Sequence, residues 1–174
     1  MNEIIKAMEE RRSIRSFKPD LPDSADIEQI LEAGLYAPSG MGKQDVITIA
    51  VTNKEIRDRL AEDNRKIGGW KEGFDPFYGA PVILIVLAKK DCFTHIYDGS
   101  LVMGNLMLAA HSLGLGSIWI HRAKEEFESE EGKQILKDLG IEGDYEGIGH
   151  LILGYAQKKA PAARPRKENY VYRV

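Results

Sequence analysis

The chain has 174 residues, of which 43% are hydrophobic and 29% charged, and its net charge is −3. This composition is typical of a globular protein that buries a core, and it predicts a single domain over residues 1–174. The slightly acidic charge argues against nucleic acid as a partner, and no apolar run approaches the roughly 18 residues of a membrane span. The single cysteine, Cys92, excludes an internal disulfide, and the first residues lack a leader-type apolar segment. We therefore expect a cytoplasmic protein.

Apolar spacing and turn residues predict the elements of the N-terminal half. In chain order they are a helix over residues 2–11, a helix capped by Asp23 that ends before Pro38, a strand over 46–51, and a helix that runs from a capping box at 52–55 to about Lys66. From Gly68 to Gly79 glycine and aromatic residues dominate without a clean period. Trp70, Phe74 and Tyr78 are candidate lid residues there, and core packing is the alternative role.

The C-terminal half continues the alternation. The predicted elements are a strand over 81–88, a helix from a cap at Asp98 to about Leu113, a strand over 117–120, a helix over 130–139 ended by Gly140, a strand over 147–155, and a strand-like segment at 170–172. The helix that follows Asp98 has no wide polar face. A helix that is apolar all round is buried, and in a chain this small we expect a second subunit to cover it.

The residues with the clearest chemical character are arginines at both ends of the chain, Arg11, Arg12 and Arg15 near the start and Arg164 and Arg166 in the tail. Guanidinium groups suit phosphate and planar carbonyl acceptors. The alternative is a basic helix end that is simply solvated. Metal-ligand spacing, a nucleophile elbow, a P-loop and a dinucleotide-binding glycine motif are all absent from the sequence.

Five short motifs, in order and spacing, resemble those of the FMN-dependent nitroreductase family. They are Glu10–Phe17 (ERRSIRSF), Ala37–Met41 (APSGM), Gly79–Pro81 before an apolar run, Leu113–Ile120 (LGLGSIWI), and Leu153–Tyr155 before a tail that carries Pro and Arg. The resemblance implies an α+β, three-layer α/β/α fold with a central, mainly antiparallel sheet flanked by helices. It also implies an intertwined homodimer with an exchanged C-terminal tail and FMN at the subunit interface.

The same resemblance implies a role for each matched residue. Arg11, Arg164 and Arg166 would hold the FMN phosphate. Arg12 and Ser13 would contact the phosphate, the ribityl chain or the pyrimidine edge of the ring with backbone and side-chain groups. Arg15 would lie at the pyrimidine edge, where a cation favours reduction of the ring. The partner's loop residues Pro38, Ser39, Gly40 and Met41 would lie along the ring, and Gly116, Ser117 and Ile118 would offer backbone donors to it. Gln44 is a further candidate cofactor-binding residue of the same loop.

The leading hypothesis is an FMN-dependent oxidoreductase that takes hydride from NADH or NADPH and reduces nitroaromatics, quinones or similar acceptors by a ping-pong mechanism. The chain departs from the family pattern at Gly42, where Asn is usual, and at Asp45 and Val46, where Pro-Trp is usual. This departure keeps open a flavin-binding member with a specialised reaction, such as dehalogenation, flavin cleavage or biosynthetic dehydrogenation, or with no turnover. A third hypothesis is a non-flavin module that binds an anionic ligand or RNA, against which the acidic charge argues.

Overall fold

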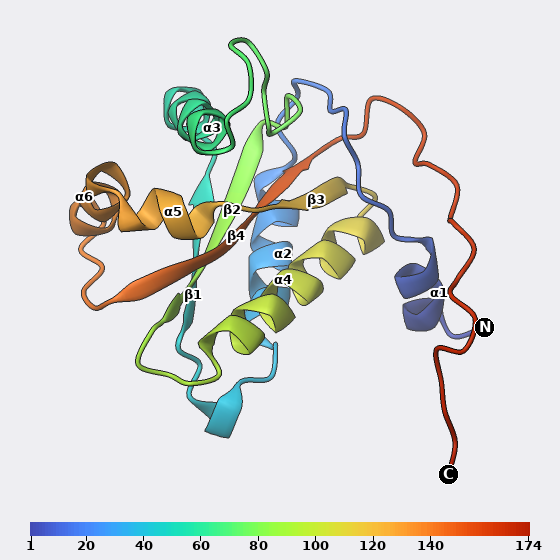
Figure 1. The fold of residues 1–174 in the computed structure, drawn as a ribbon. Helices are drawn as coiled ribbons and strands as arrows, with labels where there is room; N and C mark the ends of the chain where they lie inside the picture. The colour runs from blue at the N-terminus through green and yellow to red at the C-terminus, as the bar shows by residue number, and fades with distance from the viewer.

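A four-stranded antiparallel sheet in the order β1-β2-β4-β3 is the centre of the molecule (Figure 1). The computed structural model describes all residues from Met1 to Val174. The elements are α1 (Glu3–Glu10), α2 (Ser24–Leu35), the 3₁₀ turn η1 (Gly40–Gly42), β1 (Val46–Val51), α3 (Lys54–Ile67), β2 (Val82–Lys89), α4 (His95–Ser112), β3 (Gly116–Ile120), α5 (Ala123–Glu128), α6 (Glu130–Asp138) and β4 (Tyr145–Gly154).

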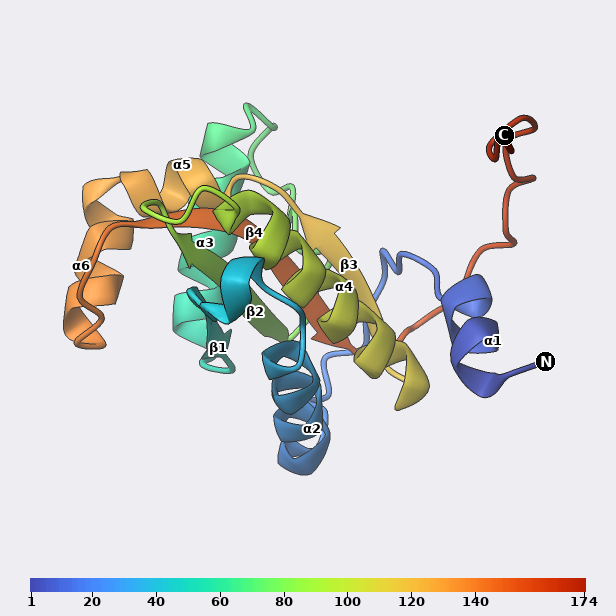
Figure 2. The same ribbon diagram turned by 90° about the horizontal axis from the view of Figure 1, so that it is seen from below.

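Helices cover both faces of the sheet, which confirms the predicted α+β, three-layer class. The view in Figure 2 shows α2 and α4 on one side and α3, α5 and α6 on the other. Each face has its own apolar cluster, because alternate residues of β2 point to opposite sides: Ile83 and Ile85 pack under α3 and α5, and Leu84 and Val86 pack under α2 and α4. Since both faces of β2 are covered, the whole strand from Val82 to Ala88 is buried.

Two helix starts differ from the sequence prediction, and one helix is missing from it. Asn53, not Thr52, caps α3 and accepts the Ile56 N–H at 3.1 Å. Helix α4 begins at His95 after Thr94, so Asp98 lies inside its first turn and is not the cap. Helix α5 was not predicted, because six residues are too few for a periodic signal. Each predicted strand from 46 to 155 is present within two residues of its expected ends.

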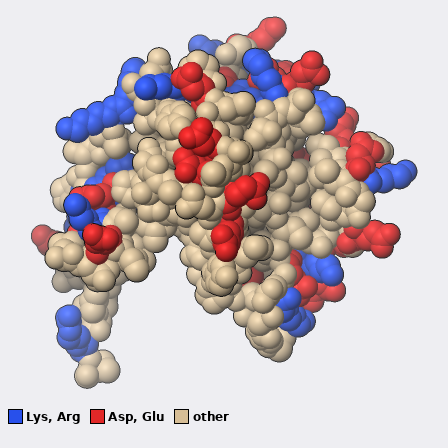
Figure 3. All heavy atoms as spheres, turned by 180° about the vertical axis from the view of Figure 1, so that it is seen from behind, with Lys and Arg blue, Asp and Glu red and all other residues tan.

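The N-terminal helix and the tail stand apart from the three layers. Helix α1 has no buried residue and leaves Ile4, Ile5 and Met8 more than half exposed. The tail after residue 156 is exposed throughout and forms no strand at 170–172, since a strand needs a neighbour to pair with. Seen from behind, a lobe is set off from the body by a notch on the side where α1 and the tail lie (Figure 3). None of the helices combines the length and apolar character of a membrane span.

Candidate functional site

The basic stretch Arg11–Phe17, which we call the arm, docks along the edge strand β3. The Ile14 N–H donates to the Ser117 carbonyl oxygen at 3.1 Å, and Ser13 pairs with Ser117 in parallel orientation. Gly116 permits this approach, because a Cβ there would lie 3.0 Å from the side chain of Ile14. Ile14 and Phe17 anchor the arm in the core, so the hydrophilic residues between and before them are presented at a fixed edge of the sheet.

The end of α1, the arm and the tail together line an open cavity of about 1270 Å³, and Glu9 and Glu10 are part of its wall. Six of the predicted cofactor residues line it: Arg11, Arg12, Ser13, Arg15, Arg164 and Arg166. The arginines come from ends of the chain that are about 150 residues apart, and only the fold brings them together. Gly116, Ser117 and Ile118 are buried in β3 beneath the arm and do not line this cavity, so any ligand contact from them would come from backbone atoms.

The arginines of the cavity lack anionic partners within the chain. Arg12 donates only to carbonyl oxygens, those of Glu9 at 2.6 Å and of Arg11 at 2.8 Å. Nη1 of Arg11 and Nε of Arg12 are buried and have no hydrogen-bond partner. Burial, and to a lesser degree the neighbouring Arg12 charge, lowers the pKa of Arg11 below its ordinary value. Two adjacent, partly desolvated cations with free donors form a site that an oxyanion would stabilise.

The predicted flavin-contacting loop, residues 38–44, lies elsewhere. Pro38, Ser39 and Gln44 line a separate cavity of about 710 Å³ between α2, β1 and the start of α4. The backbone N–H of Gly40 donates to Oδ1 of Asp98 at 3.0 Å. Met41, at the tip of the loop, is 73% exposed. The loop is therefore held against its own chain and directs its tip to solvent.

The loop and the arm sit at opposite ends of α4, as Figures 1 and 2 show. The loop is bonded to Asp98 in the first turn of the helix, whereas the arm pairs with β3, which starts four residues after the helix ends. The 18 residues of α4 correspond to a length of about 27 Å. The structure thus brings the arm, β3 and tail arginines together and leaves the loop apart from them within one chain.

The candidate lid residues form a row of rings rather than a free flap. Trp70 and Phe74 have centroids 5.2 Å apart, Phe74 and Tyr78 6.2 Å, and the Arg122 guanidinium lies 4.3 Å from the Trp70 centroid.

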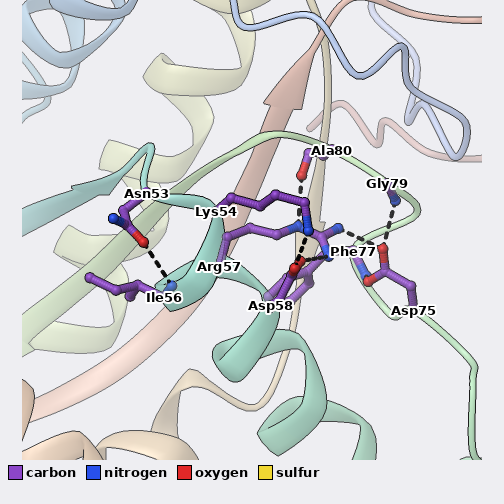
Figure 4. A network of polar contacts seen from close by, with 9 residues as sticks. All are labelled: Asn53, Lys54, Ile56, Arg57, Asp58, Asp75, Phe77, Gly79 and Ala80. Carbon is purple, nitrogen blue, oxygen red and sulfur yellow. Dashed lines mark hydrogen bonds and ion pairs between the residues drawn. The ribbon is translucent and has the colours of Figure 1, made fainter.

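The end of this segment is tied to α3 by Arg57 (Figure 4). Its guanidinium donates to the Ala80 carbonyl at 2.9 Å and to Asp75 at 2.6 Å. Asp75 in turn accepts the N–H groups of Phe77 and Gly79, each at 2.8 Å.

Two contacts made by buried polar side chains are absent from the sequence prediction. Asp98 was predicted only as a helix cap, and its contact with Gly40 spans 58 residues. Nε2 of His150 on β4 lies 2.6 Å from Oε2 of Glu126 on α5, and both side chains are fully or almost fully buried. This pair joins α5 to the sheet on the face opposite α4 and is not part of the arginine cavity. No local signal could have identified either contact, because each depends on which elements the fold places side by side.

The sequence profile described as "Nitroreductase family" matches residues 8–155, which include the arm, the loop and all four strands. The chain belongs to the nitroreductase family. A "Putative NADH dehydrogenase/NAD(P)H nitroreductase" of Methanothermobacter thermautotrophicus is 32% identical over 123 residues, which are 67% of this chain and 60% of that protein, so the match spans less than two thirds of this relative. The "FMN reductase [NAD(P)H]" of Bacillus subtilis is 29% identical over 188 aligned positions, covering 95% of this chain and 70% of the relative.

A nitroreductase of Bacteroides fragilis, solved with bound FMN, superimposes with a TM-score of 0.91 at 27% identity, and each chain is covered completely. The nitroreductase-family assignment and the fold class predicted from the motifs are thereby confirmed. The enzyme class that goes with the family, a flavin-dependent oxidoreductase, is confirmed with them. The individual site residues, the acceptor and the homodimer stay predictions.

Proposed function

We propose that this nitroreductase-family chain binds FMN in the arginine cavity, accepts hydride from NADH or NADPH, and reduces a nitroaromatic, quinone or similar acceptor. The two substrates would bind in alternation, in a ping-pong sequence. The observation that carries the proposal is the set of unpaired arginines at the docked arm. Arg11 and Arg12 keep buried N–H groups free, and the cavity wall supplies Arg164 and Arg166 from the tail.

A phosphate monoester fits this arrangement. It is a dianion at neutral pH and accepts several charge-assisted hydrogen bonds, each of which contributes about 1.5–3 kcal/mol. Bound between Arg11 and Arg12, it would relieve the like-charge repulsion that, after burial, contributes to the lowered pKa of Arg11. Arg164 and Arg166, which are exposed in the tail, would close over it.

FMN, when bound, supplies the hydride chemistry, so the protein needs no acid or base of its own for that step. The residues of the chain would bind the cofactor, orient it and tune its electrostatic surroundings. The arm fixes the phosphate end, and backbone atoms of Gly116–Ile118 border the place where the arm meets β3. Arg15 is exposed and lies in the same cavity wall, from which its positive charge would favour electron density on the pyrimidine edge.

A homodimer would complete the site. The loop and the arm are about one α4 length apart, so the loop of one chain cannot cover a cofactor held by its own arm. A twofold axis across α4 would bring the loop of one subunit beside the arm of the other. That assembly, with the tails exchanged, would cover apolar side chains that are exposed in the single chain. They belong to α1 (Ile4, Ile5, Met8), to α4 (Ile96, Tyr97, Leu101) and to the tail (Tyr170, Val171, Tyr172).

The test is the visible spectrum of the purified protein, reconstituted with FMN, before and after anaerobic addition of NADH or NADPH. We expect a yellow protein that is bleached by the nucleotide and recovers its colour on addition of a quinone or nitroaromatic. A colourless protein that cannot be reconstituted with FMN would reject the proposal. Light scattering on the same sample measures the mass, and a monomer with full flavin occupancy would reject the shared site.

The specialised alternative is favoured by one feature, the loop residues Gly42, Asp45 and Val46 in place of the usual family residues. Gly42 supplies no side-chain amide to the polar edge of a ring. A yellow protein that neither nicotinamide nucleotide bleaches would support this alternative over the general reductase.

The cytoplasmic location stays a prediction.

A further inference from the structure

Asp98 is a buried carboxylate, and no basic group forms an ion pair with it. Its side chain belongs to the first turn of α4, and the residue is 4% exposed. Oδ1 accepts the Gly40 N–H at 3.0 Å, and Oδ2 accepts the Thr94 hydroxyl at 2.8 Å. The Cys92 thiol lies 3.9 Å from Oδ2. A buried carboxylate without a cation is costly, and only these donors and the positive end of the helix dipole offset the cost here.

The loop that Asp98 holds has an unfavourable backbone. Met41 and Gln44, neither of them glycine, both have φ 55, and Gly42 between them has φ 66. Residues with a side chain adopt this left-handed region only when their surroundings enforce it. Two side chains bond to the backbone at the ends of this segment: the Ser39 hydroxyl accepts the Gln44 N–H at 3.0 Å, and Asp98 accepts the Gly40 N–H.

Gly40 packs so closely on α4 that a Cβ would collide with the Thr94 side chain. The contact from Asp98 to Gly40 is thus a tight junction between the start of α4 and the loop. The exposed tip at Met41 follows directly after it.

We infer that Asp98 is a positioning residue that fixes the loop 39–44 in the conformation in which it covers the flavin held by the other subunit. This inference rests on the proposed function for its flavin part. The anchoring itself depends only on contacts within one chain. Because the loop would already be fixed before the cofactor binds, FMN binding would not lose free energy to the ordering of the loop.

The experiment compares Asp98→Ala and Asp98→Asn with the wild type in two measurements. Hydrogen exchange on the flavin-free protein follows the Gly40 amide and its neighbours, and flavin fluorescence gives the Kd for FMN. In Asp98→Ala we expect exchange at Gly40 and a Kd that both rise by about tenfold or more, as for the loss of one hydrogen bond to a charged group. Asp98→Asn keeps an oxygen for the Gly40 N–H and should recover most of both values.

Asn53→Ala serves as the matched control, since it removes a side chain that also accepts a backbone N–H at a helix start, but on α3. It should lower the Tm and leave the Kd and the loop exchange unchanged. Should Asp98→Ala fail to fold, Gly40→Ala detaches the same junction from the loop side and should give the same two changes.

Wild-type exchange at Gly40 together with a wild-type Kd in Asp98→Ala would overturn the inference. Faster exchange with an unchanged Kd would also overturn it, because the anchor would then serve stability alone. If the wild type binds no FMN, the proposed function fails, and the exchange measurement, which uses no flavin, separately decides whether Asp98 fixes the loop.

Discussion

Arg57 and Arg11 are both partly or wholly withdrawn from solvent, yet their surroundings are opposite. The Arg57 side chain is 10% exposed and donates to Ala80, Asp75 and Asp58, as Figure 4 shows. Arg11 has no carboxylate partner, a free buried Nη1, and Arg12 beside it. A buried guanidinium whose partners come from its own chain stabilises the fold. One that is left unpaired next to another cation contributes nothing to folding and is available to an anionic ligand. Three sets of variants test this difference, and a fourth tests a partly buried carboxylate.

The largest effect is expected in the cavity wall. Replacing both Arg164 and Arg166 with alanine removes two charge-assisted partners and should weaken FMN binding by about 3–6 kcal/mol, or about 10²–10⁴ in Kd. Fluorescence titration measures this change. Arg173→Ala is the matched control, because Arg173 is exposed in the same tail but lies outside the cavity. Unchanged flavin occupancy in the double variant would count against the tail assignment.

Arg57→Ala should act on the fold instead. It leaves Asp75 and the Ala80 carbonyl without their partner, so the free energy of unfolding should fall by about 2–4 kcal/mol. Urea unfolding measures this loss. Lys54→Ala is the control, since Lys54 is an exposed partner of the same Asp58, and it should cost less than about 1 kcal/mol. A loss in Arg57→Ala no larger than in the control would contradict the comparison.

Arg11→Ala should show the reverse pattern. The Kd for FMN should rise by about 10–150-fold, corresponding to about 1.5–3 kcal/mol. The flavin-free protein should unfold at the same urea concentration or a higher one, because both burial and Arg12 disfavour the charged form, as the lowered pKa of Arg11 indicates. A drop in stability comparable to that of Arg57→Ala would place Arg11 among the structural arginines and remove the basis of the proposed site.

The smallest effect is expected at Asp63, a partly buried carboxylate. Burial, together with Glu126 and Glu131, raises the pKa of Asp63 above its ordinary value, and the opposing charges of Lys66 and Arg59 only partly offset this. The folded state then binds more protons than the unfolded state between the two values, so stability falls as pH rises through that window. Asp63→Asn should stabilise the protein at pH 7 by less than about 1 kcal/mol after solvent screening. Thermal unfolding should show the gain shrink as pH is lowered toward the ordinary carboxyl range, and a constant gain would exclude this cause.

The sequence by itself determined the sheet and most of the helices. The apolar run from Pro81 to Ala88 predicts the buried strand β2, and Gly140, at φ 68°, follows the end of its helix where expected. The five motifs also identified the family, although their roles were known only through the resemblance. These signals are local: apolar periodicity, turn residues and short motifs act within about ten residues of one another.

The tertiary structure alone decided which distant groups meet. Arg11 and Arg164 converge because the arm is paired with β3 and the tail returns from β4. Asp98, interpreted from sequence as a cap, reaches a loop 58 residues away because α4 begins earlier, at His95. Long-range pairing of this kind depends on the packing of whole elements against the sheet, and no local pattern encodes it. The same dependence separates Arg57 from Arg11, since the difference between a structural and a binding arginine lies in what the fold places beside each.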